Sequence, residues 1–98
     1  NSKLIKFKKF NSKDIDSKYY LKIRAKDQSG VLSMITSYFN EVKISVEKIF
    51  QFPDNESESI PIVITTHPIK SSELLSSVKK ISELDFILDN ISVIPIEH

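Results

Sequence analysis

Glycine and cysteine are the residue types that this sequence most lacks. Of 98 residues only Gly30 is a glycine, where average usage of ~7% would give about seven. A dinucleotide-binding fingerprint needs three glycines, and a phosphate-binding P-loop needs two followed by Lys-Ser/Thr. The chain therefore cannot hold a nicotinamide cofactor or ATP in either of these ways.

The absence of cysteine excludes a disulfide framework, a thiolate zinc site and a cysteine nucleophile. Long apolar runs are absent too: no stretch of ~18 apolar residues and no signal-peptide pattern occurs. We therefore expect a cytoplasmic protein. Because the chain begins with Asn1 and not with Met, we also expect it to be a piece of a longer protein.

What is present is typical of one globular domain, with 40% hydrophobic and 28% charged residues in 98. Charge is uneven, because residues 1–18 carry six lysines and two aspartates whereas residues 19–98 carry eight basic and eleven acidic groups. We interpret residues 1–18 as a linker and residues 19–98 as the domain, with a nucleic-acid-binding arm as the alternative for the basic segment. Within it, residues 4–10 alternate imperfectly, like an edge strand that packs on a neighbouring domain.

The first half of the domain changes its hydrophobic period once. Residues 19–26 alternate apolar and polar side chains, which predicts a half-buried strand. From Val31 to about Lys43 the apolar residues fall on one side of a helix. Residues 44–52 are strand-like, with a bulge expected where Ile49 and Phe50 break the alternation.

The second half repeats this order. Apart from Pro61, residues 60–66 are all β-branched and predict a strand that forms a hairpin with the preceding one. A helix is expected from Ser71, with Ser71 as its N-cap and Glu73 in its first turn. Residues 91–96 predict the last strand, and Pro95 should lie at an edge or a strand end because it has no N–H to donate.

The order strand, helix, strand, strand, helix, strand predicts an α+β fold. Two strand–helix–strand units with right-handed crossovers give a ferredoxin-like βαββαβ sandwich, in which a four-stranded antiparallel sheet carries two helices on one face. The other face of the sheet stays open to solvent or to a partner. This architecture hosts many unrelated functions, so the fold alone identifies none.

Catalytic chemistry has little support in the sequence. His67 and His98 have no second ligand at metal spacing, and Asp85 and Asp89 are expected to flank a turn and not to share a proton. No serine lies in a Gly-x-Ser-x-Gly context. We therefore expect no catalytic residue and no metal site, and no enzymatic activity of this chain by itself.

A common RNA-binding module shares this topology, so nucleic acid is a further candidate partner. That module stacks bases on aromatic side chains of its central strands. Residues 60–66 contain no aromatic and no basic residue, and Tyr20 alone could stack a base. We therefore expect no nucleic-acid partner and no membrane partner.

The segment from Asp27 to Leu32 is the strongest candidate for a binding site. The N-terminus of the following helix offers unpaired N–H groups to a carboxylate, and the Asp27 carboxylate suits an ammonium group. Two such features ~5 Å apart fit a free amino acid, and Gly30 would let the backbone approach it. Alternatively, Gly30 only makes the turn and Asp27 or Ser29 only caps the helix. The residues alone leave both interpretations open.

Asp27-x-Ser29-Gly30-Val31-Leu32 resembles the Asp-x-Pro-Gly-Val-Leu loop of ACT domains, which are small amino-acid-sensing regulatory modules. Over residues 19–97 the chain is similar to one branch in particular, the C-terminal ACT domain of bacterial homoserine dehydrogenase. The similarity rests on the order and spacing of several short pieces, namely residues 19–23, 27–32, 44–47, Gln51, 61–64, 66–67 and 93–94. Ser29 replaces the usual proline, and we expect serine to cap the helix instead.

The resemblance implies a receptor for end-product control, with threonine as the expected effector. It implies a site between the first loop of one copy and the second strand of another, in a homodimer whose two sheets join into one of eight strands. The matching effector-binding residues are Asp27, Gln28, Ser29, Gly30, Val31 and Leu32 in the loop, and Ile44 and Ser45 in the strand. The parent enzyme would interconvert homoserine and aspartate semialdehyde with NADP or NAD, bound upstream of this chain. A dimerisation module that binds no effector is the alternative.

Overall fold

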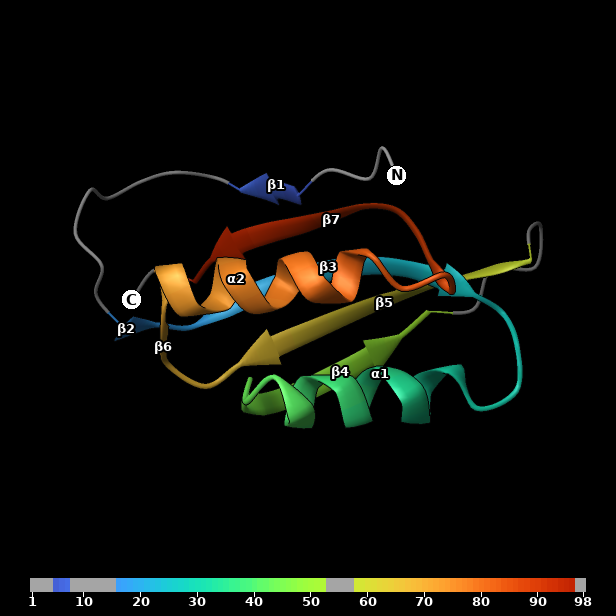
Figure 1. Cartoon of the computed structure of the whole chain (residues 1–98), viewed down its shortest axis with the longest axis horizontal. Helices are drawn as coiled ribbons and strands as arrows, with labels where there is room; N and C mark the ends of the chain where they lie inside the picture. The colour runs from blue at the N-terminus through green and yellow to red at the C-terminus, as the bar shows by residue number, and fades with distance from the viewer. Residues whose placement is uncertain (1–4, 8–15, 53–57, 97–98) are drawn as a thin grey trace.

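The computed structural model describes residues 5–7, 16–52 and 58–96. Along the chain, strands precede, separate and follow the two helices (Figure 1). The elements are β1 (Ile5–Phe7), β2 (Asp16–Ser17), β3 (Tyr19–Lys26), α1 (Val31–Glu41), β4 (Val46–Gln51), β5 (Ser59–Thr66), β6 (Ile69–Lys70), α2 (Ser71–Ser82) and β7 (Ile87–Pro95).

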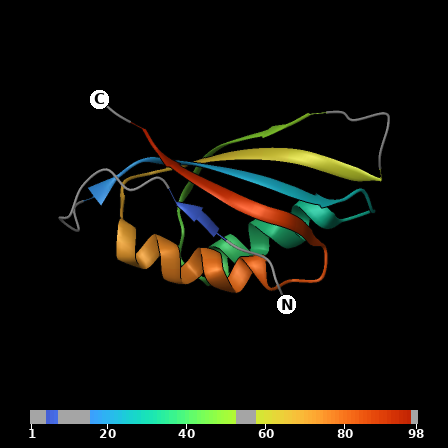
Figure 2. The ribbon, with the colours of Figure 1, turned by 90° about the horizontal axis from the view of Figure 1, so that it is seen from above.

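The main sheet has the order β1-β7-β3-β5-β4. Its pairs β7–β3, β3–β5 and β5–β4 are all antiparallel. Both helices cover the same face of this sheet, as the edge-on view in Figure 2 shows. The predicted ferredoxin-like sandwich is therefore confirmed, with the four expected strands as its antiparallel core.

The core lies between the sheet and the two helices. Every second residue of β3 is buried, as the period-two pattern predicts. Each helix buries one apolar stripe against them, because residues three and four apart share a face. The helical contributors to the core are Val31, Ile35, Phe39, Leu74, Val78 and Ile81.

The bulge in β4 lies at Glu47 and not at Ile49–Phe50, where the sequence placed it. The pairing shifts by one residue between Val46 and Lys48, and beyond the shift Ile49 pairs with Ile64 of the core face. Phe50 is therefore on the opposite face of the sheet, where it pairs with Val63 and is exposed. The alternation continues through this pair without a defect.

Both predicted side-chain caps are wrong. Helix α1 has Gly30 as its N-cap residue and α2 has Lys70, and neither helix has a side-chain cap hydrogen bond. A capping side chain belongs to a residue with extended backbone at the cap position itself. At α1 that position is held by Gly30 in the left-handed region, so neither Asp27 nor Ser29 caps the helix.

The N-terminal segment adds strands that the sequence did not assign to this domain. β1 pairs in parallel with β7, so the edge strand expected near residues 4–10 lies on the chain's own sheet and not on a neighbouring domain. β2 forms a separate two-stranded antiparallel sheet with β6. The division of the chain at residue 18 into linker and domain stays a prediction.

The last strand is longer than expected, since β7 begins at Ile87 and not at Ile91. It continues through Asp89, whose φ of 61° places it in the left-handed region, where the pairing with β3 shifts. Asp85 precedes the strand and Asp89 lies within it, so the two do not flank one turn. Pro95 is the final residue of β7, as its missing N–H predicted.

Candidate functional site

The loop between β3 and α1 is fixed to the end of the sheet by backbone hydrogen bonds. The Asp27 N–H donates to the carbonyl of Glu58 at 2.7 Å, which ties the loop to the residue preceding β5. The Gln28 N–H donates to Lys26 at 3.0 Å. Asp27, Gln28, Ser29 and Gly30 are exposed, whereas the next residue, Val31, is buried under the helix.

Gly30 joins the loop to the helix with a φ of +80°. A Cβ at this position would meet no atom within 4 Å, so space does not require glycine here and the backbone conformation does. Its carbonyl accepts the N–H of Met34 at 3.0 Å and so starts the helical ladder. Leu32 and Ser33 follow in the first turn, where N–H groups have no acceptor within the helix.

The loop opens on one side into a hollow of about 660 Å³ at the end of the sheet. Groups of both charges surround it, because a lysine and two carboxylates lie on its rim. The lining residues are Lys26, Asp27, Gln28, Glu58, Ser59 and Leu88. Such a rim can bind the ammonium and the carboxylate of a free amino acid.

Ile44 and Ser45, which were expected in a strand, lie at the other end of α1 and precede β4, which begins at Val46. Ile44 is buried and donates its N–H to Phe39 at 2.9 Å, and the Ser45 carbonyl accepts the N–H of His67 at 2.9 Å. They line a second hollow of about 430 Å³, beside Thr36, Asn40 and Lys43. Since α1 has eleven residues, about 16 Å of helix separates this hollow from the first loop. One chain therefore does not bring the two halves of the predicted site together.

Several residues around these hollows were not identified from the sequence. Thr36 and Asn40 are four apart on α1, a spacing that places both side chains on one side of a helix and could have been recognised. Lys26 and Ser59 are opposite each other in the β3–β5 register, and Glu58 is adjacent. No sequence signal identifies such neighbours, because the pairing joins residues more than thirty positions apart.

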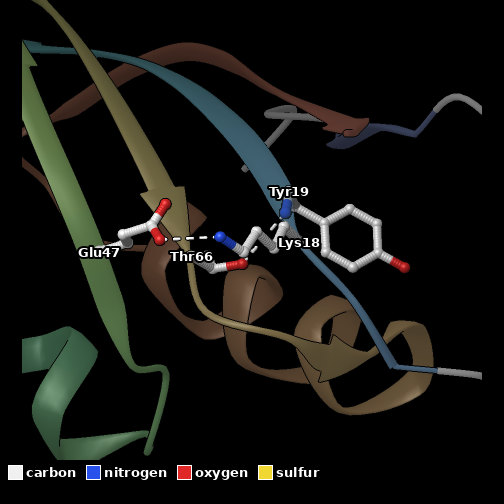
Figure 3. Close-up of polar contacts among 4 residues, drawn as sticks. All are labelled: Lys18, Tyr19, Glu47 and Thr66. Carbon is white, nitrogen blue, oxygen red and sulfur yellow. Dashed lines mark hydrogen bonds and ion pairs between the residues drawn. The ribbon is translucent and has the colours of Figure 1, made fainter. Parts of the chain in front are cut away.

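An ion pair lies beyond the second hollow, where Lys18 Nζ is 2.8 Å from Glu47 Oε2. The Tyr19 N–H beside it donates to Thr66 Oγ1 at 3.1 Å, and both contacts are drawn in Figure 3. The hydrogen bond from the Lys18 ammonium is the main reason why the pKa of the Glu47 carboxyl lies below its ordinary value. The pair joins the residue before β3 to the bulge of β4.

Two further properties bear on the kind of site. Among the described residues no three His, Asp or Glu side chains are grouped so that they could hold a metal ion. Within the same part of the chain, neither helix has the length and apolar character to cross a membrane.

Comparisons with known proteins identify relatives of this chain. The family model described as "ACT domain" matches residues 19–86. Homoserine dehydrogenase of Bacillus subtilis is 35% identical over 75 residues, which are 76% of this chain and 17% of that protein. The enzyme of Neisseria gonorrhoeae is 31% identical over 84 residues, 86% of this chain and 19% of that protein. The chain thus spans about a fifth of the length of these relatives.

Solved structures give the same result. A homoserine dehydrogenase from Thiobacillus denitrificans matches with a TM-score of 0.72 and 27% identity, over 86% of this chain and 18% of that one. The ACT domain of a GTP pyrophosphokinase from Chlorobium tepidum matches with a TM-score of 0.65, over 81% of this chain and 99% of that one. At 11% identity, the second likeness concerns the fold alone.

Proposed function

The chain belongs to the ACT domain family, and on that premise we propose that it is the amino-acid-sensing regulatory domain of a homoserine dehydrogenase, with threonine as its effector. The enzyme would interconvert homoserine and aspartate semialdehyde. NADP or NAD would be bound by the part of the protein upstream of this chain, in the cytoplasm. Two relatives that are homoserine dehydrogenases, at 31% and 35% identity, support this choice of parent enzyme.

The observation that carries the proposal is the exposed loop from Asp27 to Gly30 at the start of α1. A free amino acid presents one ammonium and one carboxylate. The Asp27 carboxylate can bind the first, and the N–H groups of the first helical turn can bind the second. Because the open space beside Gly30 is bounded by no atom within 4 Å of a Cβ position, a ligand can contact backbone there.

The position of Ile44 and Ser45 supports a site shared by two copies. β4 lies at the edge of the described sheet, so a second copy can pair with it side by side. A two-fold axis through such a pair sets the two α1 helices antiparallel and brings the N-terminus of one to the C-terminus of the other. The loop of one copy would then face Ile44 and Ser45 of its partner.

Regulation would follow from this shared site. An effector that contacts both copies binds the paired form better than the separated form, and so shifts the equilibrium towards it by its differential affinity. Coupling free energies of this kind are typically ~1–3 kcal/mol. The described residues contribute binding and pairing to this mechanism, and the chemical step belongs to the proposed parent.

Titration calorimetry of the chain against threonine, isoleucine, methionine and serine tests the proposal. We expect saturable heat with threonine at millimolar concentration. Asp27→Asn should weaken binding about tenfold or more, since a charged hydrogen bond is worth roughly 1.5–3 kcal/mol. Asp85→Asn, an exposed aspartate outside both hollows, is the matched control and should bind like the unaltered chain. A folded dimer that gives no heat with any of the four would refute the sensor function.

A dimerisation module without an effector is the second candidate, and the free edge of β4 favours it equally. Gly30→Val does not separate the two, because valine at a φ of +80° is strained whatever the space around it. Lost stability would then be confused with lost affinity. Asp27→Asn avoids this, because it keeps the backbone and the size of the side chain.

A further inference from the structure

The face of the main sheet opposite the helices is covered by no other described element, as the edge-on view in Figure 2 shows. Five large apolar side chains are exposed in the described part of the chain, and four of them lie in strands of this sheet or directly after one: Tyr20 at 42%, Phe50 at 46%, Phe52 at 48% and Ile94 at 36%. The fifth, Met34, is on α1. Exposed apolar residues that gather on one face mark an interaction surface.

The strand register places these four side chains on the open face. Tyr20 alternates with the buried Tyr19 and Leu21, and its cross-strand neighbours are Ile94 and Thr65. Phe50 pairs with Val63. Phe52 follows β4 and continues the ladder, since its N–H donates to the Pro61 carbonyl at 3.0 Å. The apolar surface therefore extends across β7, β3, β5 and β4.

Among the described positions with an assigned register, the charged side chains on this face are basic. The charged residues that the register places here are Lys22, Arg24, Lys26 and Lys48. Arg24 Nη1 donates to Ser59 Oγ at 2.6 Å, which holds the guanidinium against the sheet. Glu47, the carboxylate nearest in sequence to Lys48, is in the bulge and binds Lys18. Asp89 of β7 is exposed, but it lies where the pairing with β3 is irregular and has no assigned partner, so the register of the described strands places no carboxylate beside the four cations.

The exposed apolar side chains and the basic residues together indicate what kind of partner the open face can bind. A second copy placed face to face would set four cations against four, and like charges across an interface are costly. Single-stranded nucleic acid could stack bases on Tyr20, Phe50 and Phe52. Between them, however, β5 presents the aliphatic Val63 and offers no aromatic side chain on which a base could stack. A protein surface with an apolar centre and carboxylates around it complements both the apolar side chains and the cations of this face.

We propose that the open sheet face binds an acidic amphipathic helix of a partner protein. Its apolar stripe would pack on Phe50, Val63 and Tyr20, and its carboxylates would face the cations of β3. Strands of eight residues are about 26 Å long, which a helix of about 17 residues matches. The bound helix would convert the two-layer sandwich into three layers with both sheet faces covered.

The test is an NMR titration of the isotope-labelled chain with a synthetic helical peptide of about 18 residues, carrying leucine on one face and glutamate on the other. We expect saturable shifts at the open-face residues and weaker binding at higher salt. The matched peptide with lysine in place of glutamate should not bind. Phe50→Ala and Lys22→Glu should each weaken binding about tenfold or more.

Control variants on the helical side are Met34→Ala and Lys79→Glu, which should bind like the unaltered chain. Because all four altered residues are exposed, each variant should keep the spectrum of the folded domain. Equal binding of both peptides, shifts on the helical face, or no saturable shift at all would overturn the proposal. Tighter binding of an oligothymidylate than of the glutamate peptide would overturn it in favour of nucleic acid. Loss of threonine binding in Asp27→Asn would leave this result unchanged, so the two proposals fail independently.

Discussion

Lys18 joins two strands that are not neighbours in the sheet. Its Nζ is 2.8 Å from Glu47 Oε2 in the bulge of β4, and its carbonyl accepts the N–H of Ile96, just beyond β7, at 2.8 Å. Glu47 is two residues past Ser45, which lines the second hollow. Lys18, which directly precedes β3, is therefore bonded both to the edge strand β4 and to the residue that follows β7, the strand that pairs with β1.

Glu47→Gln should flatten the acid side of the stability–pH curve. The Lys18 ammonium lowers the pKa of the Glu47 carboxyl from its ordinary value of 4.5, so the unfolded chain takes up this proton at a higher pH than the folded one. The stabilisation is complete above that value and is lost as the pH falls through the lowered one. Urea unfolding between pH 3 and 7, roughly the range in which carboxylates titrate, measures it. Lys18→Gln should flatten the curve in the same way, and an unchanged acid limb in both variants would contradict the prediction.

Gly30→Ala should destabilise the domain by about 1–2 kcal/mol, because an L-residue is disfavoured in the left-handed region. The space around the position is open, so the loss comes from the backbone conformation and not from a clash. Gly30→Asn is the control and should lose less, since asparagine tolerates this conformation. Chemical denaturation measures both variants. Equal stability of the alanine variant and the unaltered chain would show that the loop relaxes to another conformation.

Phe39→Ala and Phe50→Ala should differ sharply although they remove the same atoms. Phe39 is 1% exposed in the core and Phe50 is 46% exposed on the open face. Truncating a buried phenylalanine costs ~3–5 kcal/mol, whereas an exposed substitution stays within about 0.5 kcal/mol. Thermal unfolding of the two variants measures the difference. Similar losses would mean that the open face is covered in solution.

Gln51→Pro should prevent pairing of two copies through β4 and leave the single domain folded. Hydrogen bonds to one neighbour alternate along an antiparallel strand, and the Phe52 N–H donates to β5, so the N–H of Gln51 points to the free edge. Proline there removes a donor that only a second copy would use. Sedimentation equilibrium measures the dimer, with Gln51→Ala as the control that keeps the N–H. A dimer of unchanged strength in the proline variant would place the contact elsewhere.

Thr65→Val should stabilise the domain by about 1 kcal/mol. Thr65 is 5% exposed, and its Oγ1 is buried without a hydrogen-bond partner in the described structure. A buried hydroxyl without a partner costs ~1–3 kcal/mol, which valine of nearly the same shape avoids. Thr66 gives the contrast, because its Oγ1 accepts the N–H of Tyr19. Thr66→Val should therefore destabilise in the same unfolding assay, and a loss in both variants would show that Thr65 has a partner in solution.

Local pattern was enough to predict the core elements. The alternation of residues 19–26 predicts β3 with the bounds observed, and the helical stripe from Val31 predicts α1 with its first residue. Each of these elements follows from one periodic apolar face, and that period is visible in the short stretch of sequence that forms the element. The position of Asp27 in the loop after β3 followed from the elements around it, whereas Ser45, which was expected in a strand, precedes β4.

What could not be predicted depends on register and on distant pairing. The bulge at Glu47 and the shift opposite Asp89 are set by how two strands fit together, and neither strand shows it alone. The one-sided charge of the open face has the same origin, because Lys48 joins Lys22 and Arg24 only after β4 and β3 take their places in one sheet. The parallel pairing of β1 with β7 joins residues more than eighty positions apart.

The short strand β1 changes which edges the sheet offers to further copies. It occupies the side of β7 on which another strand would otherwise add, and it presents in its place an edge of three residues, Ile5–Phe7. Very short edge strands are one of the ways in which proteins discourage pairing of sheets between molecules. Among the described strands, β4 therefore offers the longer edge, and a two-fold pairing there uses that edge up in both copies.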